Sequence, residues 1–344
     1  MPEKNTGNAG NVFHAGEIAL QRQLGVADRL EEIGRRMVHR ELPEQHRSFY
    51  PQLPFVIAGA VDGEDDVWAM LLAGEAGFLT TPAADTLVIS VSIDPADPGA
   101  GGFKAGRHVG LLGIELDTRR RNRLNGVITT DRGGRYEVRV RQAFGNCPQY
   151  IRLRDYRFDR SPSLPMEADS VWLDHLDTAA RTLIRAADAF FVASYADVEG
   201  ERQVDVSHRG GMPGFVQVSS DGLLTIPDYR GNRHFNTLGN ILVNPKAGLL
   251  FIDFETGDLL QLAGDAAVDN DPRIAAILPG AERAWTFRPR KIVRRLAAAP
   301  LRWIARKDGH SRASPALALD PNHSTRVAPR SAGEGRRLPL APTS

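Results

Sequence analysis

A short polar motif, residues 205–215, carries the side chains best suited to hold a phosphate group. We expect it to begin as a strand, in which Ser207 and Arg209 lie two residues apart and therefore on the same face. Gly210 and Gly211 follow, and glycines let backbone N–H groups come close to a ligand. A hydroxyl, a guanidinium and free amides suit a phosphate monoester, because arginine offers a planar set of several donors.

A second cluster, residues 228–233, continues the same chemistry. Arg230 and Arg233 lie in a predicted turn that leads into a short helix. Free N–H groups at a helix N-terminus attract anions. The helix also carries polar side chains, namely Asn236, Thr237 and Asn240. Together the two clusters favour a phosphate site, and the alternative is a pair of basic turns that face the solvent.

An internal repeat places these clusters in the second of two copies. Residues 109–118 match residues 247–256 without a gap. Further matches lie at nearly the same offset: Gly126 with Gly264, Gly77-Phe78 with Gly214-Phe215, and Phe55-Val56 with Phe191-Val192. Each copy shows short apolar runs separated by turn signals, which predicts a helix and then about six strands in a small antiparallel barrel.

The matching positions of the first copy lack this phosphate chemistry. Residues 70–77 stand where the second copy has residues 207–214; the arginine is absent and Glu75 adds a carboxylate, which repels phosphate. We therefore expect the first copy to be a degenerate structural counterpart. Its own basic run, residues 119–123, is expected to be a solvated turn; a position over a cofactor or at an interface is the alternative.

Other candidate groups are weaker. The nine histidines show no metal-binding spacing, so no metal site is expected. Cys147, the single cysteine, excludes an intramolecular disulfide. It is expected to be a small buried side chain before a proline turn, the alternative being a reactive thiol. His208 and His234 are the only titratable candidates near the presumed site, and no catalytic residue is assigned.

Length and charge bound the functional classes. The 344 residues suit two domains, and 43 basic against 42 acidic residues give a net charge of +1. Such a balance provides no general attraction to nucleic acid or to an anionic membrane. The first residues lack the apolar segment of a signal peptide, and no apolar run approaches the roughly 20 residues of a membrane span. A cytoplasmic protein is expected.

The basic stretch from residue 288 to 307 alternates with apolar residues. It is expected to form a final strand and helix, the alternative being a basic amphipathic helix on a membrane or a partner. Residues 309–344 are expected to be disordered.

Several motifs resemble the pyridoxamine 5′-phosphate oxidase-like flavin-binding proteins. They are residues 113–126, 144–151, 205–215, 231–240 and 244–251. The resemblance, over roughly residues 13–305, implies a mainly β fold with α (α+β), made of two tandem split β-barrels that are each preceded by a helix. It further implies an FMN cofactor at the barrel–barrel interface. In this resemblance Ser207 and Arg209 contact the phosphate, and the second side of the site consists of Asn232, Arg233, Asn236 and Thr237.

The resemblance implies an FMN-binding oxidoreductase that transfers electrons or hydride to an unidentified small molecule. The alternative is a non-enzymatic module that binds a flavin or another phosphate-bearing ligand for storage, sensing or partner docking. Expected partners are the substrate and either a nicotinamide donor or a separate electron-transfer protein, not nucleic acid or a membrane. The two copies would meet within one chain, as an internal pseudo-dimer, or across a homodimer.

The expected domain organisation follows from these predictions. Residues 1–45 form a helical extension, residues 46–160 the first barrel with its degenerate site, and residues 161–176 a linker. Residues 177–305 form the second barrel with the flavin phosphate site, and residues 306–344 a disordered tail.

Overall fold

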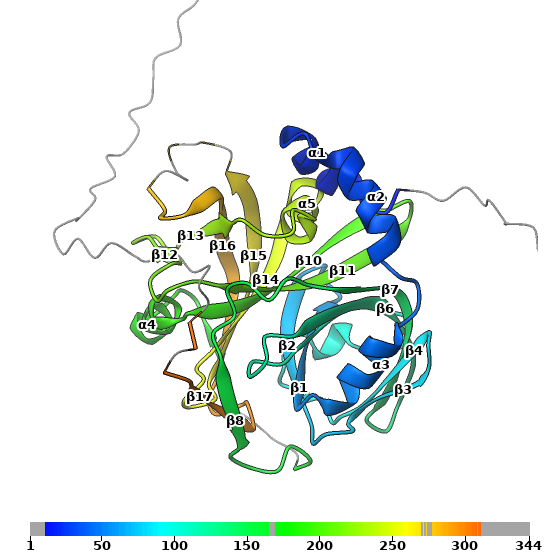
Figure 1. Ribbon diagram of the computed structural model, residues 1–344. Coiled ribbons are helices and arrows are strands. Elements are labelled where there is room, and N and C mark those ends of the chain that lie inside the picture. The colour runs from blue at the N-terminus through cyan, green and yellow to red at the C-terminus, as the bar shows by residue number, and fades with distance from the viewer. Residues whose placement is uncertain are drawn as a thin grey trace, which may run out of the picture.

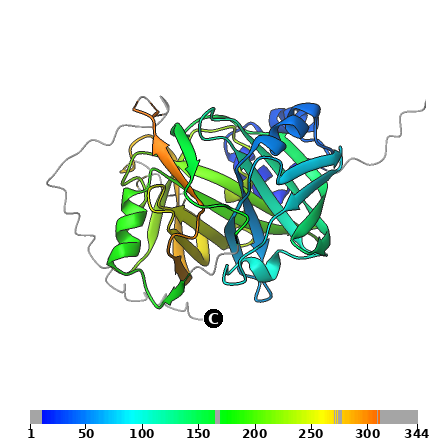
Figure 2. The ribbon, with the colours of Figure 1, turned by 90° about the horizontal axis from the view of Figure 1, so that it is seen from below.

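Two large antiparallel sheets pack against each other, with helices at their margins (Figures 1 and 2). The structure is a computed structural model, and it describes residues 11–164, 169–269, 271, 273, 277–307 and 309–310. The first sheet contains β1 (Phe55–Val61), β2 (Val67–Ala73), β3 (Leu79–Ala83), β4 (Thr86–Ser90), β5 (His108–Ile114), β6 (Arg121–Arg132) and β7 (Arg135–Gly145). The second contains β9 (Ser170–Leu173), β10 (Ala189–Val198), β11 (Glu201–Gly210), β12 (Gln217–Val218), β13 (Leu224–Tyr229), β14 (Lys246–Ile252), β15 (Leu259–Asp269) and β16 (Ala281–Arg295).

The remaining elements are short. A separate two-stranded sheet joins β8 (Arg154–Phe158) to β17 (Leu301–Ala305). The α-helices of the described residues are α1 (Ala15–Gln23), α2 (Ala27–Met37), α3 (Glu44–Phe49), α4 (Thr178–Ala186) and α5 (Asn236–Val243). Two 3-10 turns complete the set, η1 (Tyr50–Gln52) and η2 (Ala100–Gly102). The mainly β composition with added helices agrees with the expected fold class.

The two sheets have the same topology. The strand order is β2-β1-β5-β6-β7-β4-β3 in the first and β11-β10-β14-β15-β16-β13-β12 in the second. These orders are identical once the strands are matched in chain order, which is the correspondence that the sequence repeat predicts. Among the described residues, the end strands of each order do not pair with one another. The pairings therefore form open sheets and do not close the barrels expected from the sequence.

A shared β-bulge fixes the match between the copies. The register of β6 against β7 shifts immediately before Gly126, and that of β15 against β16 shifts immediately before Gly264. A Cβ at Gly126 would lie 2.3 Å from the carbonyl oxygen of Arg139, and one at Gly264 would lie 2.1 Å from that of Arg288. Both positions need glycine for the same reason, a close approach of the neighbouring strand.

One proposed match is wrong. Two strand pairs define the register, Ala58 with Leu111 and Val192 with Leu249. Because the repeat itself matches Leu111 with Leu249, Ala58 corresponds to Val192, and the match of Phe55 with Phe191 is displaced by two residues. A slip of two leaves every side chain on its own face of the strand, so alternating apolar residues do not reveal it.

The two sheets contact each other in an approximately two-fold way. A Cβ at Gly110 in β5 would lie 2.6 Å from the carbonyl oxygen of Val204 in β11. With the halves exchanged, a Cβ at Gly248 in β14 would lie 2.1 Å from the carbonyl oxygen of Val67 in β2. Apolar side chains of both halves form one buried cluster around these crossings. The halves are therefore held together by a continuous core.

The helices partly follow the prediction. The helical extension expected over residues 1–45 contains two helices, α1 and then α2, which are separated by a break at Gly25, whose φ is +65°. Helix α1 packs against α5, at the upper side of the molecule in Figure 1. Asp177 caps α4 by accepting a hydrogen bond from the Ala180 backbone N–H at 2.8 Å.

The basic C-terminal stretch contains no helix between residues 288 and 305. It forms the end of β16 and then β17, and strand β9, inside the expected linker, pairs with β16. Its cations bridge to the first half, where Arg290 and Lys291 both contact Asp66, at 2.6 and 2.8 Å. Arg290 is left unpaired by the shift of register between Lys291 and Pro289, so two consecutive side chains reach one carboxylate. Residues 311–344, expected to be disordered, lie outside the described residues.

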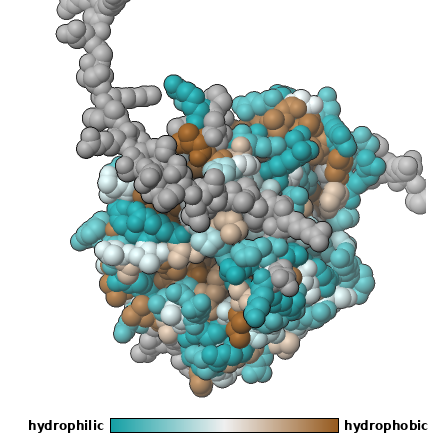
Figure 3. All heavy atoms as spheres, turned by 60° about the vertical axis from the view of Figure 1, so that its left-hand side comes forward, coloured by the Kyte–Doolittle hydropathy of each residue, from teal (hydrophilic) through white to brown (hydrophobic). Residues whose placement is uncertain are grey.

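Hydrophilic side chains cover most of the face seen in Figure 3, with smaller hydrophobic areas between them. Within the described residues, none of the helices has the length and apolar character required to cross a bilayer.

Candidate functional site

A cavity of about 110 Å³ lies where the two sheets meet, near the start of α5. The first half contributes the beginning of β6 and the segment after β7, through Arg121, Arg123, Asn146, Cys147, Gln149 and Tyr150. The second half contributes the end of β11, Phe215, the end of β13 and residues 231–233 and 235–237. Seven of the nine predicted site residues line it, namely Ser207, Arg209, Gly210, Asn232, Arg233, Asn236 and Thr237.

The other two predicted residues lie elsewhere. Arg230 is exposed, and only its carbonyl oxygen approaches the cavity wall, accepting a hydrogen bond from the Tyr150 hydroxyl at 2.8 Å. The backbone N–H of Gly211 donates to the carbonyl of Asp188 at 3.0 Å, and a Cβ there would meet the Phe215 ring. The structure therefore gives Gly211 a packing role and assigns Arg230 no place in the cavity.

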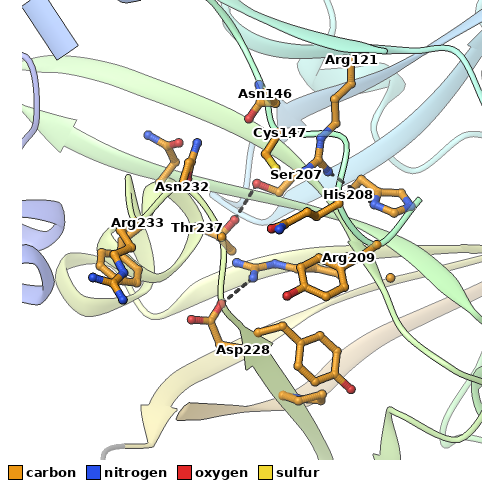
Figure 4. A pocket seen from close by; sticks show the side chains of 18 of the residues that line it. Arg121, Asn146, Cys147, Ser207, His208, Arg209, Asp228, Asn232, Arg233 and Thr237 are labelled. Atoms are coloured by element: carbon orange, nitrogen blue, oxygen red, sulfur yellow. Dashed lines mark hydrogen bonds and ion pairs between the residues drawn. The ribbon is translucent and has the colours of Figure 1, made fainter. Parts of the chain in front are cut away.

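Ser207 connects the two halves at the cavity floor. Its hydroxyl oxygen accepts a hydrogen bond from Arg123 Nη2 at 2.7 Å and another from Thr237 Oγ1 at 2.9 Å. Figure 4 shows Ser207 and Thr237 facing each other across the site. Arg123 also donates to Asn236 Oδ1 at 2.7 Å and lies 3.0 Å from the Asp205 carboxylate. A side chain of the first half thus organises the hydroxyls of the second.

Arg209 is partly neutralised by a neighbour that the sequence analysis did not single out. Its Nη1 donates to Asp228 Oδ1 at 2.6 Å, as the dashed line in Figure 4 marks. Arg283 lies 3.8 Å from the other oxygen of the same carboxylate. The expected alternation on β11 is confirmed, because Ser207 and Arg209 both reach the cavity, but Arg209 does so as half of an ion pair.

The basic run of the first copy is not a solvated turn throughout. Only its first two residues precede β6; Arg121 and Arg123 are the first and third residues of that strand and line the cavity. Burial, with Arg123 nearby, lowers the pKa of Arg121 to about 10, so its guanidinium stays charged at neutral pH. Their spacing of two residues, the same as that of Ser207 and Arg209, is the signal that could have identified them.

The loop before α5 adopts an uncommon backbone. Arg233 and Phe235 have φ of +62° and +61°, in the left-handed region that side chains other than glycine seldom adopt. Arg233 lies 3.7 Å from Glu282, and Asn232 Oδ1 accepts the His234 backbone N–H at 3.1 Å. This conformation turns the chain so that the N-terminus of α5 faces the cavity. Strain kept at such a position is typical of binding sites.

The two histidines near the site are neutral at physiological pH. Burial, together with Arg121, Arg154 and Arg209, holds the pKa of His208 well below its usual value. Burial, with Arg123, lowers the pKa of His234 to about 4. Neither imidazole is therefore in the protonated, imidazolium form at neutral pH, and neither adds positive charge to the cavity.

Cys147 lines the cavity and is half-buried, instead of being packed in the core as expected. In the described residues no group of three or more His, Cys, Asp and Glu side chains is placed to hold a metal ion.

The N-terminal helix supports the site from behind. Asn236 donates from Nδ2 to Glu17 Oε1 at 2.5 Å, and the His14 backbone N–H donates to the other oxygen at 2.9 Å. Burial raises the pKa of Glu17 to about 8, against the opposing effect of these hydrogen bonds. A buried carboxyl of α1 is thereby linked through Asn236 to Arg123.

No family model and no curated protein matches the chain. Some solved structures match part of it: a variant of HupZ from Group A Streptococcus is 13% identical, covering 35% of this chain and 98% of its own, with a TM-score of 0.28. A FAD-binding protein from Mesorhizobium loti is 15% identical, with coverages of 38% and 99% and a TM-score of 0.26. A protein of the pyridoxinephosphate oxidase family from Clostridium acetobutylicum is 13% identical, with coverages of 37% and 86% and a TM-score of 0.22.

These matches concern little more than a third of the chain. At such identities and TM-scores they carry no argument about ligand or activity. The family suggested by the sequence motifs stays a prediction.

Proposed function

We propose that this protein binds FMN with its phosphate in the cavity between the sheets, and that it uses the flavin to transfer electrons or hydride to a small molecule. The observation that supports this most is the convergence of four arginines, two hydroxyls and a helix N-terminus in one cavity. The arginines are Arg121, Arg123, Arg209 and Arg233, and the hydroxyls are those of Ser207 and Thr237. Charge-assisted hydrogen bonds from such donors are the strong contacts of a phosphate group.

Residues that line the cavity also carry buried donors that no described residue satisfies. Arg121 Nε, Arg123 Nε and Arg209 Nε have no hydrogen-bond partner among the described residues, nor does Asn146 Nδ2. Unsatisfied buried donors cost about 1–3 kcal/mol each. A ligand with several anionic oxygens would remove that cost.

An aromatic pair borders the same cavity. The rings of Tyr150 and Tyr229 stack with 5.3 Å between centroids and 28° between planes, one ring from each half. A planar surface of this kind suits a ligand with an extended ring system beside its phosphate. When bound, FMN supplies the electron or hydride transfer, and the chain's residues hold the phosphate and limit access of water.

The neutral histidines are compatible with this proposal. Hydride transfer by a flavin needs binding and orientation from the protein more than a protein acid or base. The rival, a module that binds flavin without turnover, rests on the same residues, since no described residue of the cavity stands out as a proton donor. A nicotinamide or a separate electron-transfer protein would be the electron source for the enzyme.

Absorption spectroscopy of the purified full chain tests the proposal. Titration with FMN should give a stoichiometric shift of the flavin bands, weakened at least about tenfold in Ser207→Val, which loses the hydroxyl at the cavity floor. Arg230→Gln, outside the cavity, is the matched control and should bind as the parent does. Absence of FMN binding by the parent protein would refute the proposal. Bound flavin that resists reduction would favour the module.

A further inference from the structure

The repeat defines a second region, equivalent to the cavity by strand correspondence, which we call the filled counterpart. It consists of Met70, Leu72, Asp97, Gln261 and Arg295. In the matched strands, Met70 and Leu72 of β2 take the places of Ser207 and Arg209 of β11. The counterpart is packed: a Cβ at Gly99 would lie 2.5 Å from the Met70 sulfur.

A carboxylate of the protein itself occupies the centre of the filled counterpart. Asp97 is buried, and its Oδ1 accepts the Gly99 backbone N–H at 2.9 Å and Gln261 Nε2 at 3.1 Å. Its Oδ2 accepts from Arg295 Nη1 at 2.7 Å. Arg295 also contacts Asp94. An anionic group is thus held here by a side-chain amide, a guanidinium and a backbone N–H.

The donors of that carboxylate have equivalents in the open cavity. Gln261 corresponds to Arg123, because β15 and β6 match without a gap through their shared bulge. In the repeat, Asn122 of β6 matches Leu260 of β15, and these pair with Gly145 and Arg294 respectively. The next residues along the chain, Asn146 and Arg295, therefore correspond to each other. Both equivalents line the cavity, and Asn146 Nδ2 has no hydrogen-bond partner among the described residues.

Charge compensation singles out another residue of the same wall. Three arginines of the cavity have carboxylates nearby: Arg123 has Asp205 at 3.0 Å, Arg209 has Asp228 at 2.6 Å and Arg233 has Glu282 at 3.7 Å. Arg121 has no carboxylate within ion-pair distance among the described residues; its Nη1 lies 3.5 Å from the neutral His208 ring. Its charge is therefore the one most available to a ligand.

We propose that the first half, the degenerate copy, holds the anionic group of the ligand. Arg121 is its principal charged contact, and Arg123 and Asn146 donate to it in the place that the Asp97 carboxylate takes in the filled counterpart. This rests on the proposed function and deepens it, since that proposal did not rank the donors of the cavity and the sequence analysis assigned the phosphate to Ser207 and Arg209. It applies to any phosphate-bearing ligand of the cavity.

Inorganic phosphate is the first probe, measured by isothermal titration at constant ionic strength. The parent chain should bind it, and Arg121→Gln should weaken binding about tenfold or more, since a hydrogen bond to a charged group is at stake. Arg121→Lys should restore part of the affinity because it keeps the charge. Arg230→Gln serves as the matched exposed control, and near-UV circular dichroism verifies that each variant is folded. Equal phosphate affinity in folded Arg121→Gln and the parent would overturn the proposal.

A second measurement separates this inference from the proposed function. The ratio of FMN to riboflavin affinity isolates the phosphate contribution, and Arg121→Gln should reduce that ratio about tenfold while leaving riboflavin binding nearly unchanged. Phosphate binding that depends on Arg121, without FMN binding, would refute the flavin proposal alone. An unchanged FMN-to-riboflavin ratio in Arg121→Gln would refute the inference alone. A parent chain that binds neither phosphate nor FMN would refute both the inference and the proposed function.

Discussion

The open cavity and the filled counterpart are built on matching strands but have opposite contents. In the cavity, Ser207 of β11 accepts a hydrogen bond from Arg123 of β6. In the counterpart, Met70 stands in the place of Ser207, and Gln261, in the place of Arg123, donates to the Asp97 carboxylate. One region presents cations to a ligand, whereas in the other the Asp97 carboxylate accepts hydrogen bonds from Gln261 and Arg295. Arg295 Nε, like the Nε atoms of the cavity arginines, has no partner among the described residues.

The comparison shows that strand order alone does not preserve a site. The two sheets have the same strand order and therefore place equivalent backbones alike. A few side chains then decide whether the space beside those strands is open or filled. It also shows that each region needs both halves, because the Gln261 amide also donates to the carbonyl of Ala69 in the other sheet, at 3.0 Å. Neither region is therefore the property of one copy.

The largest expected effect comes from emptying the filled counterpart. Asp97→Ala removes the buried partner of Arg295, and an uncompensated buried charge costs about 3–5 kcal/mol of unfolding free energy. Urea denaturation of the full chain measures this loss. Added phosphate should stabilise the variant more than it stabilises the parent, because the donors released from Asp97 can bind an external anion.

The double variant Asp97→Ala/Arg295→Met is the control for that experiment. Removing both charges should be much less destabilising than removing one, since the penalty lies in the unpaired guanidinium. If Asp97→Ala lowers the unfolding free energy by less than about 1 kcal/mol, Asp94 alone is sufficient to compensate Arg295. The Asp97 carboxylate would then not be the anion that the donors of the counterpart require.

The next effect concerns the carboxyl behind the open cavity. Burial raises the pKa of Glu17 from its ordinary value of 4.5 to about 8, with Asp205 adding to the rise and Arg123 opposing it. Between these pH values the folded chain holds a proton that the unfolded chain has released. Stability should therefore fall as pH rises through this window, by at most about 1.4 kcal/mol per pH unit.

Urea midpoints from pH 5 to pH 9 test this directly. Glu17→Gln keeps an acceptor for Asn236 and should remove that part of the pH dependence, so its curve and the parent's should diverge across the window. Parallel curves would mean that Glu17 titrates alike in the folded and unfolded chain.

Much of this comparison could be predicted from the sequence. The rest could not, because it depends on contacts between residues that are far apart in the chain. The repeat, the strand that carries Ser207 and Arg209, and the helix at Asn236 follow from local patterns. The pairing of Arg209 with Asp228 was missed because it joins strands that are not sequential neighbours. Arg121 was assigned to a solvated turn, since charge runs usually face water and no local pattern reports a contact with the other copy.

A smaller effect should sharpen the role of Arg209. Asp228→Asn keeps the shape of the side chain but leaves the guanidinium without its closest carboxylate. Phosphate affinity should rise about fivefold, or 1 kcal/mol. Asp197→Asn, which breaks the exposed pair with Arg202 at 2.9 Å, is the control and should leave phosphate affinity unchanged. A decrease in affinity in Asp228→Asn would indicate that Asp228 positions Arg209 more than it neutralises it.

The smallest effect tests why the counterpart has no ligand. The sequence suggested that the Glu75 carboxylate repels phosphate, but Glu75 is exposed, and the space is filled by Met70 and by the pair of Asp97 with Arg295. Charge at an exposed position is screened by water and salt. Glu75→Gln should therefore change the unfolding free energy by less than about 0.5 kcal/mol and add no second phosphate site in titration calorimetry. A second binding equivalent in this variant would restore repulsion as the cause, because the packing around Asp97 would be the same as in the parent.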